Sequence, residues 1–368
     1  MKILQAVHAF PPSQGGIEHH VYHLSKELVK MDNEVVVVTT NEKGQKSEEK
    51  LEGIEIKRLP AIKFPLFSAA RLPIGACITM IKENADIYAS HGYGSIMPLF
   101  TAMAALVRKK PFIFTLHGYP IVKGKRKIFY YFYRLFIAPV FLALATKVIV
   151  VSRASLPFIT KEVSKNKIVY IPNGIDEKFD CKLDYENKKY ITYIGRLDED
   201  KGIDILIKAY SRINKKYPNL KLQIVGKDEG IKNKLQKLAE KLNVELIFKE
   251  TPYDRIKEVY CESKAIVLPS KYEGFSLVWL EATASGRPMF STPVGEAPAF
   301  FEQVYEKNKD LFLFKDENEL VKKLDEFLTD ENKYKKIIER AKYIVHEEYS
   351  WENIALQTLN VYKEIVKK

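Results

Sequence analysis

The stretch AIVLPSKYEGFSLVWLEATASGRP, residues 265–288, joins a short apolar run to a glycine turn and a second, longer apolar run. Residues 265–270 predict a buried strand, and the residues that follow Gly274 predict a helix that ends at Gly286. Two glutamates, Glu273 on the turn and Glu281 inside the helix, lie eight positions apart. Carboxylates are seldom buried without a partner, so both of these side chains need one.

The same strand–helix alternation extends over nearly the whole chain, which predicts parallel sheets with helices on both faces. We therefore expect an α/β fold of two doubly wound, Rossmann-like domains, residues 1–178 and 186–345. A polar stretch, NGIDEKFDCKLDYENKKY, separates them. An amphipathic helix at about 348–368 is expected to pack back on the first domain. The predicted strands are residues 2–7, 34–40, 85–90, 111–116, 147–152, 167–172, 189–195, 220–226, 244–249, 265–270, 287–292 and 310–314.

The composition is that of a globular protein, with 368 residues, 46% of them apolar and 29% charged. This length gives two domains that each bury a core, and it argues against long disordered segments. The three cysteines, Cys77, Cys181 and Cys261, are far apart and odd in number. We expect no disulfide framework, no zinc site and a reducing, cytoplasmic environment. The first ten residues show no secretory signal pattern.

The net charge of +12 predicts an anionic partner, and one region concentrates the positive charge. Residues 120–167 contain ten basic side chains and a single acidic one, Glu162. In the same region, residues 128–146 are apolar and aromatic enough to consider as a membrane span. Arg134 and Pro139 interrupt this run, which favours a buried or membrane-surface helix fronted by basic residues. The segment 123–136 is thus a candidate for contact with an anionic membrane.

The loop GRLDEDKG, residues 195–202, follows a predicted strand and precedes a helix. Gly195 permits a tight exit from the strand, while Arg196 and Lys201 lie beside the positive end of the helix dipole. Two cations and a helix N-terminus suit a diphosphate, although a solvated basic loop would show the same residues. The acidic run 198–200 is interpreted as solvated rather than metal-binding.

Other strand ends in the first domain carry glycine and histidine. Gly15 and Gly16 open a helix predicted over residues 17–31, without the G-x-G-x-x-G spacing of a dinucleotide site. His91 and His117 each end a strand and are followed by glycine. Either histidine is a satisfied residue or a hydrogen-bond partner for a sugar or phosphate. Neither has a metal-ligand motif beside it, so we expect no metal site.

In open α/β sheets, ligands bind beyond the carboxyl ends of the strands, so we expect these residues to meet in a cleft between the two domains. There Glu273 would accept hydrogen bonds from sugar hydroxyls. The backbone N–H groups of Gly274, Phe275 and Ser276 would face the same cleft. Glu281 would bind a vicinal diol, since a carboxylate accepts two O–H bonds. Salt bridges to neighbouring lysines are the alternative for one of the two glutamates.

Together these motifs resemble the retaining family 4 (group 1) glycosyltransferases, which have the GT-B fold. The resemblance rests on GRLDEDKG and PSKYEGFSLVWLEATASGRP, with GGIEHHV, TLHG, VSRAS and IPNGID in the family's usual order. It covers nearly the whole chain. Two positions depart from the family pattern. Gly295–Glu296 stands where two glycines are frequent, and Ser276 replaces a frequent glycine.

The resemblance implies a role for each matching residue. The second domain would bind the nucleotide sugar and the first the acceptor. Arg196 and Lys201 would hold the donor diphosphate and stabilise the leaving group, and His117 would contact the transferred sugar. The remaining implied contacts are Glu281 to the ribose; Glu273, Gly274, Phe275, Ser276 and Leu277 to the sugar and phosphates; Gly16 to phosphates or acceptor; and Gly15, Ser152 and Arg153 on the acceptor side.

The implied activity is transfer of a hexose from a UDP-, GDP- or ADP-sugar with retention and without a metal. The acceptor would be a glycan or a lipid-linked sugar at the inner face of the cell membrane. A sugar-nucleotide 2-epimerase on the same fold is one alternative. A non-enzymatic basic protein that binds membranes or nucleic acid is another, although the chain has no helix-turn-helix, zinc-finger or RNP-like motif, so nucleic acid is not expected.

Overall fold

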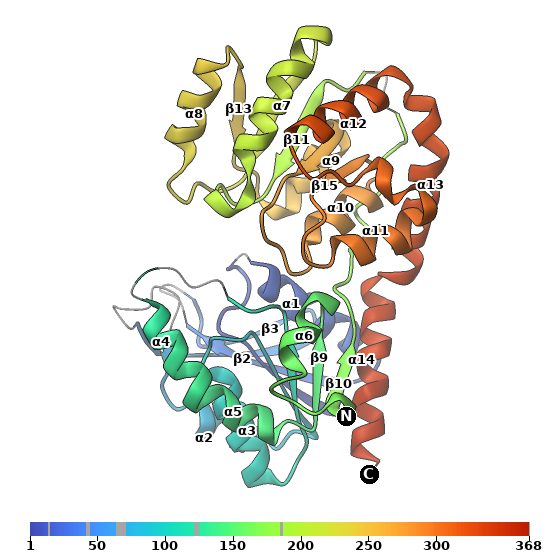
Figure 1. The fold of residues 1–368 in the computed structure, drawn as a ribbon. Coiled ribbons are helices and arrows are strands. Elements are labelled where there is room, and N and C mark those ends of the chain that lie inside the picture. The colour runs from blue at the N-terminus through green and yellow to red at the C-terminus, as the bar shows by residue number, and fades with distance from the viewer. Residues whose placement is uncertain are drawn as a thin grey trace. The chain divides into compact units, whose positions relative to one another are not determined.

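The computed structural model describes residues 1–13, 15–41, 45–63, 71–120, 124, 126–184 and 187–367. The chain forms two compact units, and each has its own parallel sheet (Figure 1). The first unit comprises residues 1–174 and 351–368, and the second comprises residues 175–350. The polar stretch after Gly174 therefore belongs to the second unit.

The first unit is built on an eight-stranded sheet in the order β10-β9-β8-β7-β1-β2-β4-β3, parallel except for the β3–β4 pair. The next two strands along the chain after β4, β5 and β6, form a separate antiparallel pair. Its elements are β1 (Lys2–Ala6), α1 (Gly16–Lys30), β2 (Glu34–Thr40), β3 (Glu48–Leu51), β4 (Ile54–Leu59), β5 (Ala61–Lys63), β6 (Arg71–Pro73), α2 (Ala76–Glu83), β7 (Ile87–His91), α3 (Met97–Arg108), β8 (Phe112–Leu116), α4 (Arg126–Phe132), η1 (Tyr133–Ile137), α5 (Ala138–Leu144), β9 (Lys147–Val150), η2 (Arg153–Ser155), α6 (Leu156–Ile159), η3 (Lys165–Lys167), β10 (Ile168–Tyr170) and α14 (Trp351–Val366).

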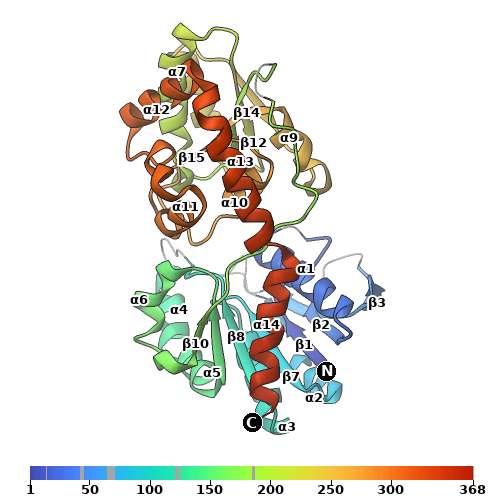
Figure 2. The same ribbon diagram turned by 90° about the vertical axis from the view of Figure 1, so that its right-hand side faces the viewer.

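Alternating residues of these strands feed two hydrophobic cores, one on each face of the sheet. Leu4 of β1 packs in one core with residues of α3 and α5, while its neighbour Ile3 packs in the other with residues of α1 and α14. Helix α14 contacts α1 and contributes Trp351 and Leu359 to that second core (Figure 2). The last helix of the chain therefore completes the first unit.

The second unit is built on a five-stranded parallel sheet in the order β13-β12-β11-β14-β15. Its elements are β11 (Tyr190–Ile194), η4 (Glu199–Lys201), α7 (Ile203–Lys216), β12 (Lys221–Val225), α8 (Lys232–Lys241), β13 (Leu246–Lys249), η5 (Tyr253–Arg255), α9 (Ile256–Glu262), β14 (Ser263–Leu268), α10 (Leu277–Ala284), β15 (Met289–Ser291), α11 (Ala297–Tyr305), η6 (Glu306–Leu311), α12 (Glu317–Thr329) and α13 (Glu331–Glu348).

The doubly wound α/β fold class is confirmed, and eleven of the twelve predicted strands are present. The strand predicted at residues 310–314 is wrong. This segment is the end of η6 followed by a single bridge between Leu313 and Ser291, and Phe312 and Phe314 are buried without a ladder. Strands β3 to β6 were not predicted. β3, β5 and β6 are only three or four residues long, and β4 (six residues) alternates buried and half-buried positions and so has no continuous apolar run.

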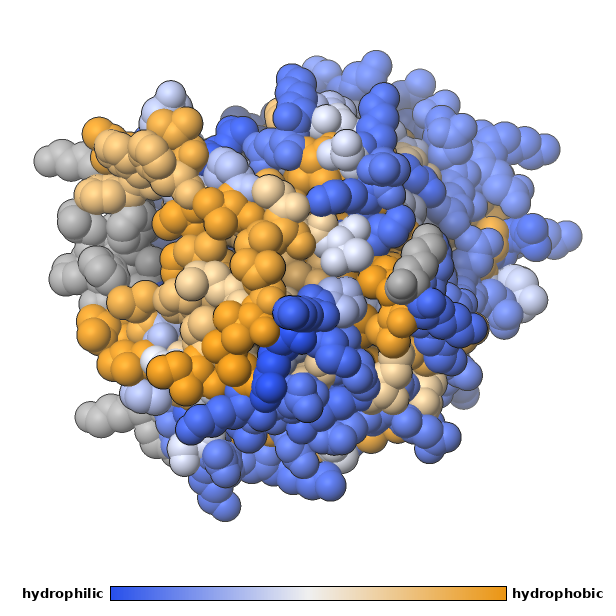
Figure 3. All heavy atoms as spheres, turned by 90° about the horizontal axis from the view of Figure 1, so that it is seen from below, coloured by the Kyte–Doolittle hydropathy of each residue, from blue (hydrophilic) through white to orange (hydrophobic). Residues whose placement is uncertain are grey.

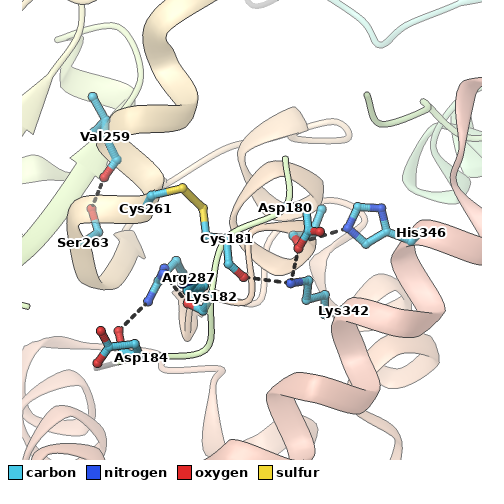
Figure 4. The surroundings of a disulfide bond; sticks show 11 residues. Asp180, Cys181, Lys182, Asp184, Val259, Cys261, Ser263, Arg287, Lys342 and His346 are labelled. Carbon is cyan, nitrogen blue, oxygen red and sulfur yellow. Dashed lines mark hydrogen bonds and ion pairs between the residues drawn. A yellow bond between two sulfur atoms is a disulfide. The ribbon is translucent and has the colours of Figure 1, made fainter. Parts of the chain in front are cut away.

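The expectation that the cysteines form no disulfide is also wrong. Cys181 and Cys261 are bonded, with their Cα atoms 5.4 Å apart (Figure 4). They are 80 residues apart in sequence, but residues 180–184 run beside the end of α9. Buried Arg287 holds this segment by donating to the carbonyls of Lys182 and Asp184, at 2.7 and 3.1 Å. Cys77 is free.

The aromatic segment after residue 126 forms one continuous helix, α4–η1–α5, in which η1 is a π-helical turn. Its stretch Lys127–Leu144 is long and apolar enough to cross a membrane, yet only 22% of these residues are buried. Phe141 and Leu142 enter the core, whereas Phe132 and Phe136 are exposed. The helix is therefore a surface helix rather than a buried one. Residues 123 and 125 of the predicted segment 123–136 lie outside the described residues.

Candidate functional site

In the second unit, the loops that follow two adjacent strands touch each other. Gly202, at the end of the loop after β11, has φ of 62°, and a Cβ there would lie 2.1 Å from the carbonyl oxygen of Pro269, after β14. The backbone N–H of Lys271 donates to the carbonyl of Asp200 at 2.8 Å. Because β11 and β14 are parallel neighbours, their carboxyl ends bring GRLDEDKG and SKYEG together.

This contact places Lys201 beside Glu273. The Lys201 Nζ and Glu273 Oε1 atoms are 2.5 Å apart, and the Ser270 hydroxyl donates to the same carboxylate oxygen at 2.8 Å. Both charged side chains are largely buried, at 17% and 11% exposed. Two of the predicted site residues are thus partners in one ion pair.

Arg196 lies on the same loop but is oriented differently. Its side chain is 61% exposed, and its Nη1 atom is 3.7 Å from Asp198 Oδ2. Asp198 also begins η4, where its other oxygen accepts a hydrogen bond from the N–H of Asp200 at 3.0 Å. Asp198 is therefore more than a solvated charge. It fixes the local turn and balances Arg196, whose exposed guanidinium can move to a phosphate.

In the turn before α10, the two residues nearest the helix, Phe275 and Ser276, are buried. Ser276 is the N-cap residue of α10, but its hydroxyl makes no capping bond. The ring of Phe275 packs inward, 6.0 Å from the ring of Trp279 and 5.9 Å from that of Phe300. Phe275 therefore anchors the turn, which leaves only its N–H for a ligand. Gly274 and Leu277 are partly exposed on either side of it.

The structure explains why glycine is kept at position 295 while Glu296 stands where a second glycine is frequent in the family. Gly295 has φ of 60°, and a Cβ there would lie 2.1 Å from the carbonyl oxygen of Glu273. The N–H of Glu296 donates to the carbonyl of Gly274 at 3.0 Å. The loop of Gly295 and Glu296 packs against the backbone of the turn at Glu273 and Gly274, so a glycine is required at position 295. The side chain of Glu296 is accommodated in a buried position.

Glu281 is buried in α10 at 5% exposure, and among the described residues two tyrosines donate hydrogen bonds to it while Lys178 interacts with it through its charge. The Tyr260 hydroxyl donates to one carboxylate oxygen at 2.6 Å and the Tyr253 hydroxyl to the other at 3.1 Å. Burial raises the pKa of Glu281 to about 7, although both tyrosine bonds oppose this rise. A diol would bind by sharing these two oxygens with the tyrosines or by displacing one of them.

The sequence analysis missed the residues around Glu281. Tyr253 and Tyr260 come from η5 and α9, and Phe179 packs edge-on against both rings, at 6.1 and 5.6 Å. Lys178 Nζ lies 3.9 Å from the centre of the Tyr253 ring, and burial lowers the pKa of this lysine. No motif identifies these four residues. The aromatic residues of DEKFD and TPYDRIKEVY were the only signal.

In the first unit, Gly15 is the N-cap residue of α1 and Gly16 its first residue. A Cβ on Gly15 would lie 2.2 Å from a carboxylate oxygen of Glu18, which curls back over the helix start. Glu18 is buried and pairs with His8 at 3.3 Å. A carboxylate therefore lies at the helix start predicted to receive a phosphate or the acceptor.

His117 follows β8, and the structure brings it together with His91 at the end of β7. His91 Nδ1 and His117 Nε2 are 3.2 Å apart. His20 of α1, which the sequence analysis did not consider, packs edge-on against His117 with ring centres 4.6 Å apart. Burial lowers the pKa of His20 to about 4 and the pKa values of the other two well below 6.5. All three imidazoles are therefore neutral at pH 7.

Ser152 and Arg153 have local structural partners. Ser152 is fully buried, and its hydroxyl accepts a hydrogen bond from the N–H of Ala154 at 3.2 Å, at the start of η2. The Arg153 guanidinium lies 4.2 Å from the centre of the Tyr170 ring. These contacts give both residues a local structural role in the first unit.

Comparison with known proteins identifies the family. Residues 174–343 match the family described as Glycosyl transferases group 1, and residues 14–179 match the one described as Glycosyltransferase Family 4. The chain belongs to the group 1 glycosyltransferases. An uncharacterised glycosyltransferase of Methanocaldococcus jannaschii is 28% identical over 99% of this chain and 98% of its own length. The phosphatidylinositol N-acetylglucosaminyltransferase gpi3 subunit of Schizosaccharomyces pombe is 27% identical over 97% of this chain and 79% of its own.

Solved structures show that the transferase has the GT-B fold. Anabaena HepE in complex with UDP matches with a TM-score of 0.76 and 19% identity, covering 99% of this chain and 100% of that one. Sucrose-phosphate synthase of Thermosynechococcus elongatus matches with a TM-score of 0.76 and 18% identity, covering 98% of both chains. At these identities the likeness establishes the fold and leaves the substrates of the transferase open.

The raised pKa of Glu281 predicts how the stability of the transferase depends on pH. Between its ordinary value of 4.5 and about 7, the folded chain holds a proton on Glu281 that the unfolded chain has released. The contribution of Glu281 to the free energy of unfolding is therefore largest below pH 4.5. It falls by about 1.4 kcal/mol per pH unit across this window.

Glu281→Gln should remove this decrease. The free energy of unfolding of wild type and variant is measured by urea unfolding at several pH values between about 5 and 7. The difference between the two proteins cancels the other titrating groups. Parallel curves would show that Glu281 is already ionised in the folded chain.

Proposed function

We propose that this chain is a retaining glycosyltransferase that moves a hexose from a nucleotide-diphosphate sugar to a glycan or a lipid-linked sugar. The observation that carries the proposal is the convergence of Lys201, Glu273 and the turn before α10 at the carboxyl ends of β11 and β14. A cation and a carboxylate side by side suit a molecule that has a diphosphate next to a hydroxylated sugar.

The two cations act on the leaving group. When the bond between the anomeric carbon and the phosphate oxygen breaks, negative charge grows on the diphosphate, and Arg196 and Lys201 stabilise it. Lys201 is already held in place by Glu273, so little side-chain ordering is needed at that position. Arg196 is exposed and supplies the second charge after leaving Asp198. Because these cations do the work of a metal on the diphosphate, we expect no requirement for Mg²⁺ or Mn²⁺.

The remaining contacts orient the donor. Glu273 accepts bonds from hydroxyls of the transferred sugar, and the N–H groups at Gly274, Phe275 and Ser276 bind its oxygens or those of the phosphates. Glu281 binds the ribose diol as an ionised carboxylate, between Tyr253 and Tyr260. In the first unit, His117 contacts the transferred sugar, and Gly15 and Gly16 serve the phosphate or the acceptor.

The first test is of the donor and the reaction type. Sugar nucleotides are screened by thermal shift, beginning with UDP-sugars because a solved structural neighbour binds UDP. The stabilising donor is then used for transfer in the absence of added divalent cations. We expect a product whose anomeric configuration, read by NMR, equals that of the donor. An inverted linkage, a strict Mg²⁺ or Mn²⁺ requirement, or free epimerised sugar formed without an acceptor would contradict the corresponding part of the proposal.

The second test is of the ion pair. Lys201→Ala removes a charge that faces the leaving group, so we expect a loss of kcat of roughly 10²- to 10³-fold. Glu273→Gln keeps the shape and the Ser270 hydrogen bond but removes the charge, and should also reduce turnover sharply. Lys234→Ala is the matched control, since Lys234 pairs with Glu199 on the surface of the same unit and is 72% exposed.

Circular dichroism and thermal unfolding separate this result from misfolding. Both site variants should keep the fold, because each changes one polar contact in the loops after β11 and β14 and leaves the apolar core of the second unit intact. Turnover like that of the wild type in both variants would show that the diphosphate and sugar bind elsewhere.

We also propose that the chain binds the cytoplasmic face of an anionic membrane through one side of its first unit. Seventeen large hydrophobic side chains are exposed in the described residues, and eleven of them lie on or just before α2, α3 and the helix α4–η1–α5. Figure 3 shows hydrophobic side chains gathered on one part of this side of the molecule. The eleven are Ile74, Ile78, Met103, Leu106, Val107, Ile128, Tyr131, Phe132, Leu135, Phe136 and Val140.

Their number and their helical setting favour a lipid surface. Helices α3 and α5 contact each other, and so do α2 and α3, so the three helices form one continuous face. Monomeric soluble proteins rarely expose an apolar face of this extent without a partner. Arg134 pairs with Glu162 at 2.7 Å, which brings exposed Lys161 next to η1. Aromatic residues flanked by lysine and arginine are typical of interfacial helices.

Flotation with liposomes tests the membrane proposal. Phe132→Ser with Phe136→Ser removes two exposed rings, which stack 6.0 Å apart, and should reduce association with anionic vesicles by roughly ten-fold or more. Tyr343→Ser is the control, because Tyr343 is equally exposed but belongs to the second unit. Association should also weaken with salt. Wild-type flotation by the double variant would show that this face does not bind lipid.

A further inference from the structure

Three histidines of the first unit meet although they come from three different elements: His20 from α1, His91 from β7 and His117 from the loop after β8. Each offers one ring nitrogen, and these three nitrogens all lie within 4.8 Å of one another. His20 and His91 are buried, whereas His117 is partly exposed. The sequence analysis expected no metal site, because no metal-ligand motif accompanies His91 or His117, and it did not consider His20.

The outer hydrogen bonds of the cluster decide which nitrogens carry hydrogen. His20 Nδ1 is 2.9 Å from Asn173 Oδ1, and His91 Nε2 is 2.7 Å from Gln5 Oε1. An amide oxygen only accepts, so both of these ring nitrogens are donors. The other ring nitrogens, His20 Nε2 and His91 Nδ1, therefore carry lone pairs.

These bonds have the arrangement found around metal-bound histidines. A histidine ligand almost always donates its second N–H to an oxygen, which fixes the tautomer and the orientation of the ring. Asn173 and Gln5 provide such oxygens for two of the three rings. His117 Nε2, which now lies 3.2 Å from His91 Nδ1, becomes the third lone pair when its ring takes the other neutral tautomer.

The spacing and the donor type indicate which ion would fit. Two nitrogens that each lie about 2.0–2.1 Å from a tetrahedral zinc ion are about 3.3 Å apart. The His91–His117 separation of 3.2 Å is close to this value. An all-imidazole set suits Zn²⁺ and its neighbours Co²⁺, Ni²⁺ and Cu²⁺, whereas Mg²⁺ and Ca²⁺ prefer oxygen ligands.

We propose that His20, His91 and His117 bind one transition-metal ion of the zinc class, with a fourth position open to water or a hydroxyl oxygen. Three protein ligands and one open position are typical of catalytic rather than structural zinc sites. All the ligands and their hydrogen-bond partners come from the first unit. His117 is also the residue proposed to contact the transferred sugar, and a sugar hydroxyl would then reach it through the open position of the ion. Binding of the ion itself does not rest on the proposed transfer reaction, in which Arg196 and Lys201 act on the diphosphate.

The test measures metal binding without donor or acceptor. The full-length protein is stripped of metal and titrated with Co²⁺, whose visible absorption reports a tetrahedral nitrogen site, and zinc is counted by elemental mass spectrometry. We expect about one ion per chain in the wild type. His20→Gln and His91→Gln should lose it. His19→Gln is the matched control on the same helix, since the histidines grouped here are His20, His91 and His117, while His19 Nε2 lies 3.2 Å from His23 Nε2.

A second variant, Asn173→Ala, tests the proposal even if the histidine variants fail to fold. It leaves all three ligands in place but removes the acceptor for His20, so the Co²⁺ affinity should fall by roughly 10- to 100-fold. Zinc should also raise the unfolding temperature of the wild type and not that of His20→Gln. If the wild type binds no Co²⁺ or zinc, or if His19→Gln lowers binding as much as His20→Gln does, the proposal fails and the three rings form a hydrogen-bonded cluster only.

Discussion

The candidate donor site depends on one backbone contact, the close approach of the loop after β11 to the loop after β14. Gly202 has a positive φ, and its Cα faces the Pro269 carbonyl so closely that a side chain would overlap it. This approach, together with the hydrogen bond from Lys271 to Asp200, sets the distance between Lys201 and Glu273. The backbone contacts between the two loops therefore fix the positions of the two side chains that form the ion pair.

The two glutamates of the opening motif meet their need for a partner in different ways. Glu273 is near the surface of the unit, where Lys201 compensates its charge. Glu281 is deeper, and its partners are neutral hydroxyl groups, so burial raises its pKa. The two sites suit different parts of one ligand: an ion pair for the charged and hydroxylated end, and a buried carboxylate for a neutral diol.

The sequence predicts the framework of the molecule well, because the strands of both sheets are apolar runs that only a parallel sheet with two covered faces accommodates. Motif spacing also placed Lys201 and Glu273 at the carboxyl ends of strands, although it did not show that these two strands are neighbours. Spacing could not reveal contacts that depend on distant segments. Tyr253 and Tyr260 reach Glu281 from another part of the chain, and His20 reaches His117 from α1. The pairing of Cys181 with Cys261 was missed for the same reason, since an odd number of scattered cysteines says nothing about which two are neighbours.

The segment after Gly174 shows how this limitation affects the site itself. Its composition is that of a linker, yet Lys178 and Phe179 pack on Tyr253, whose hydroxyl donates to Glu281. The next residues are fixed by the disulfide and by Arg287, and Lys342 bonds to Asp180 and to the carbonyl of Cys181 (Figure 4). Covalent and polar contacts over a few residues thus replace the hydrophobic packing that holds most site residues. A polar segment can form one side of a binding site when such contacts remove its freedom, and composition alone does not distinguish it from a flexible linker.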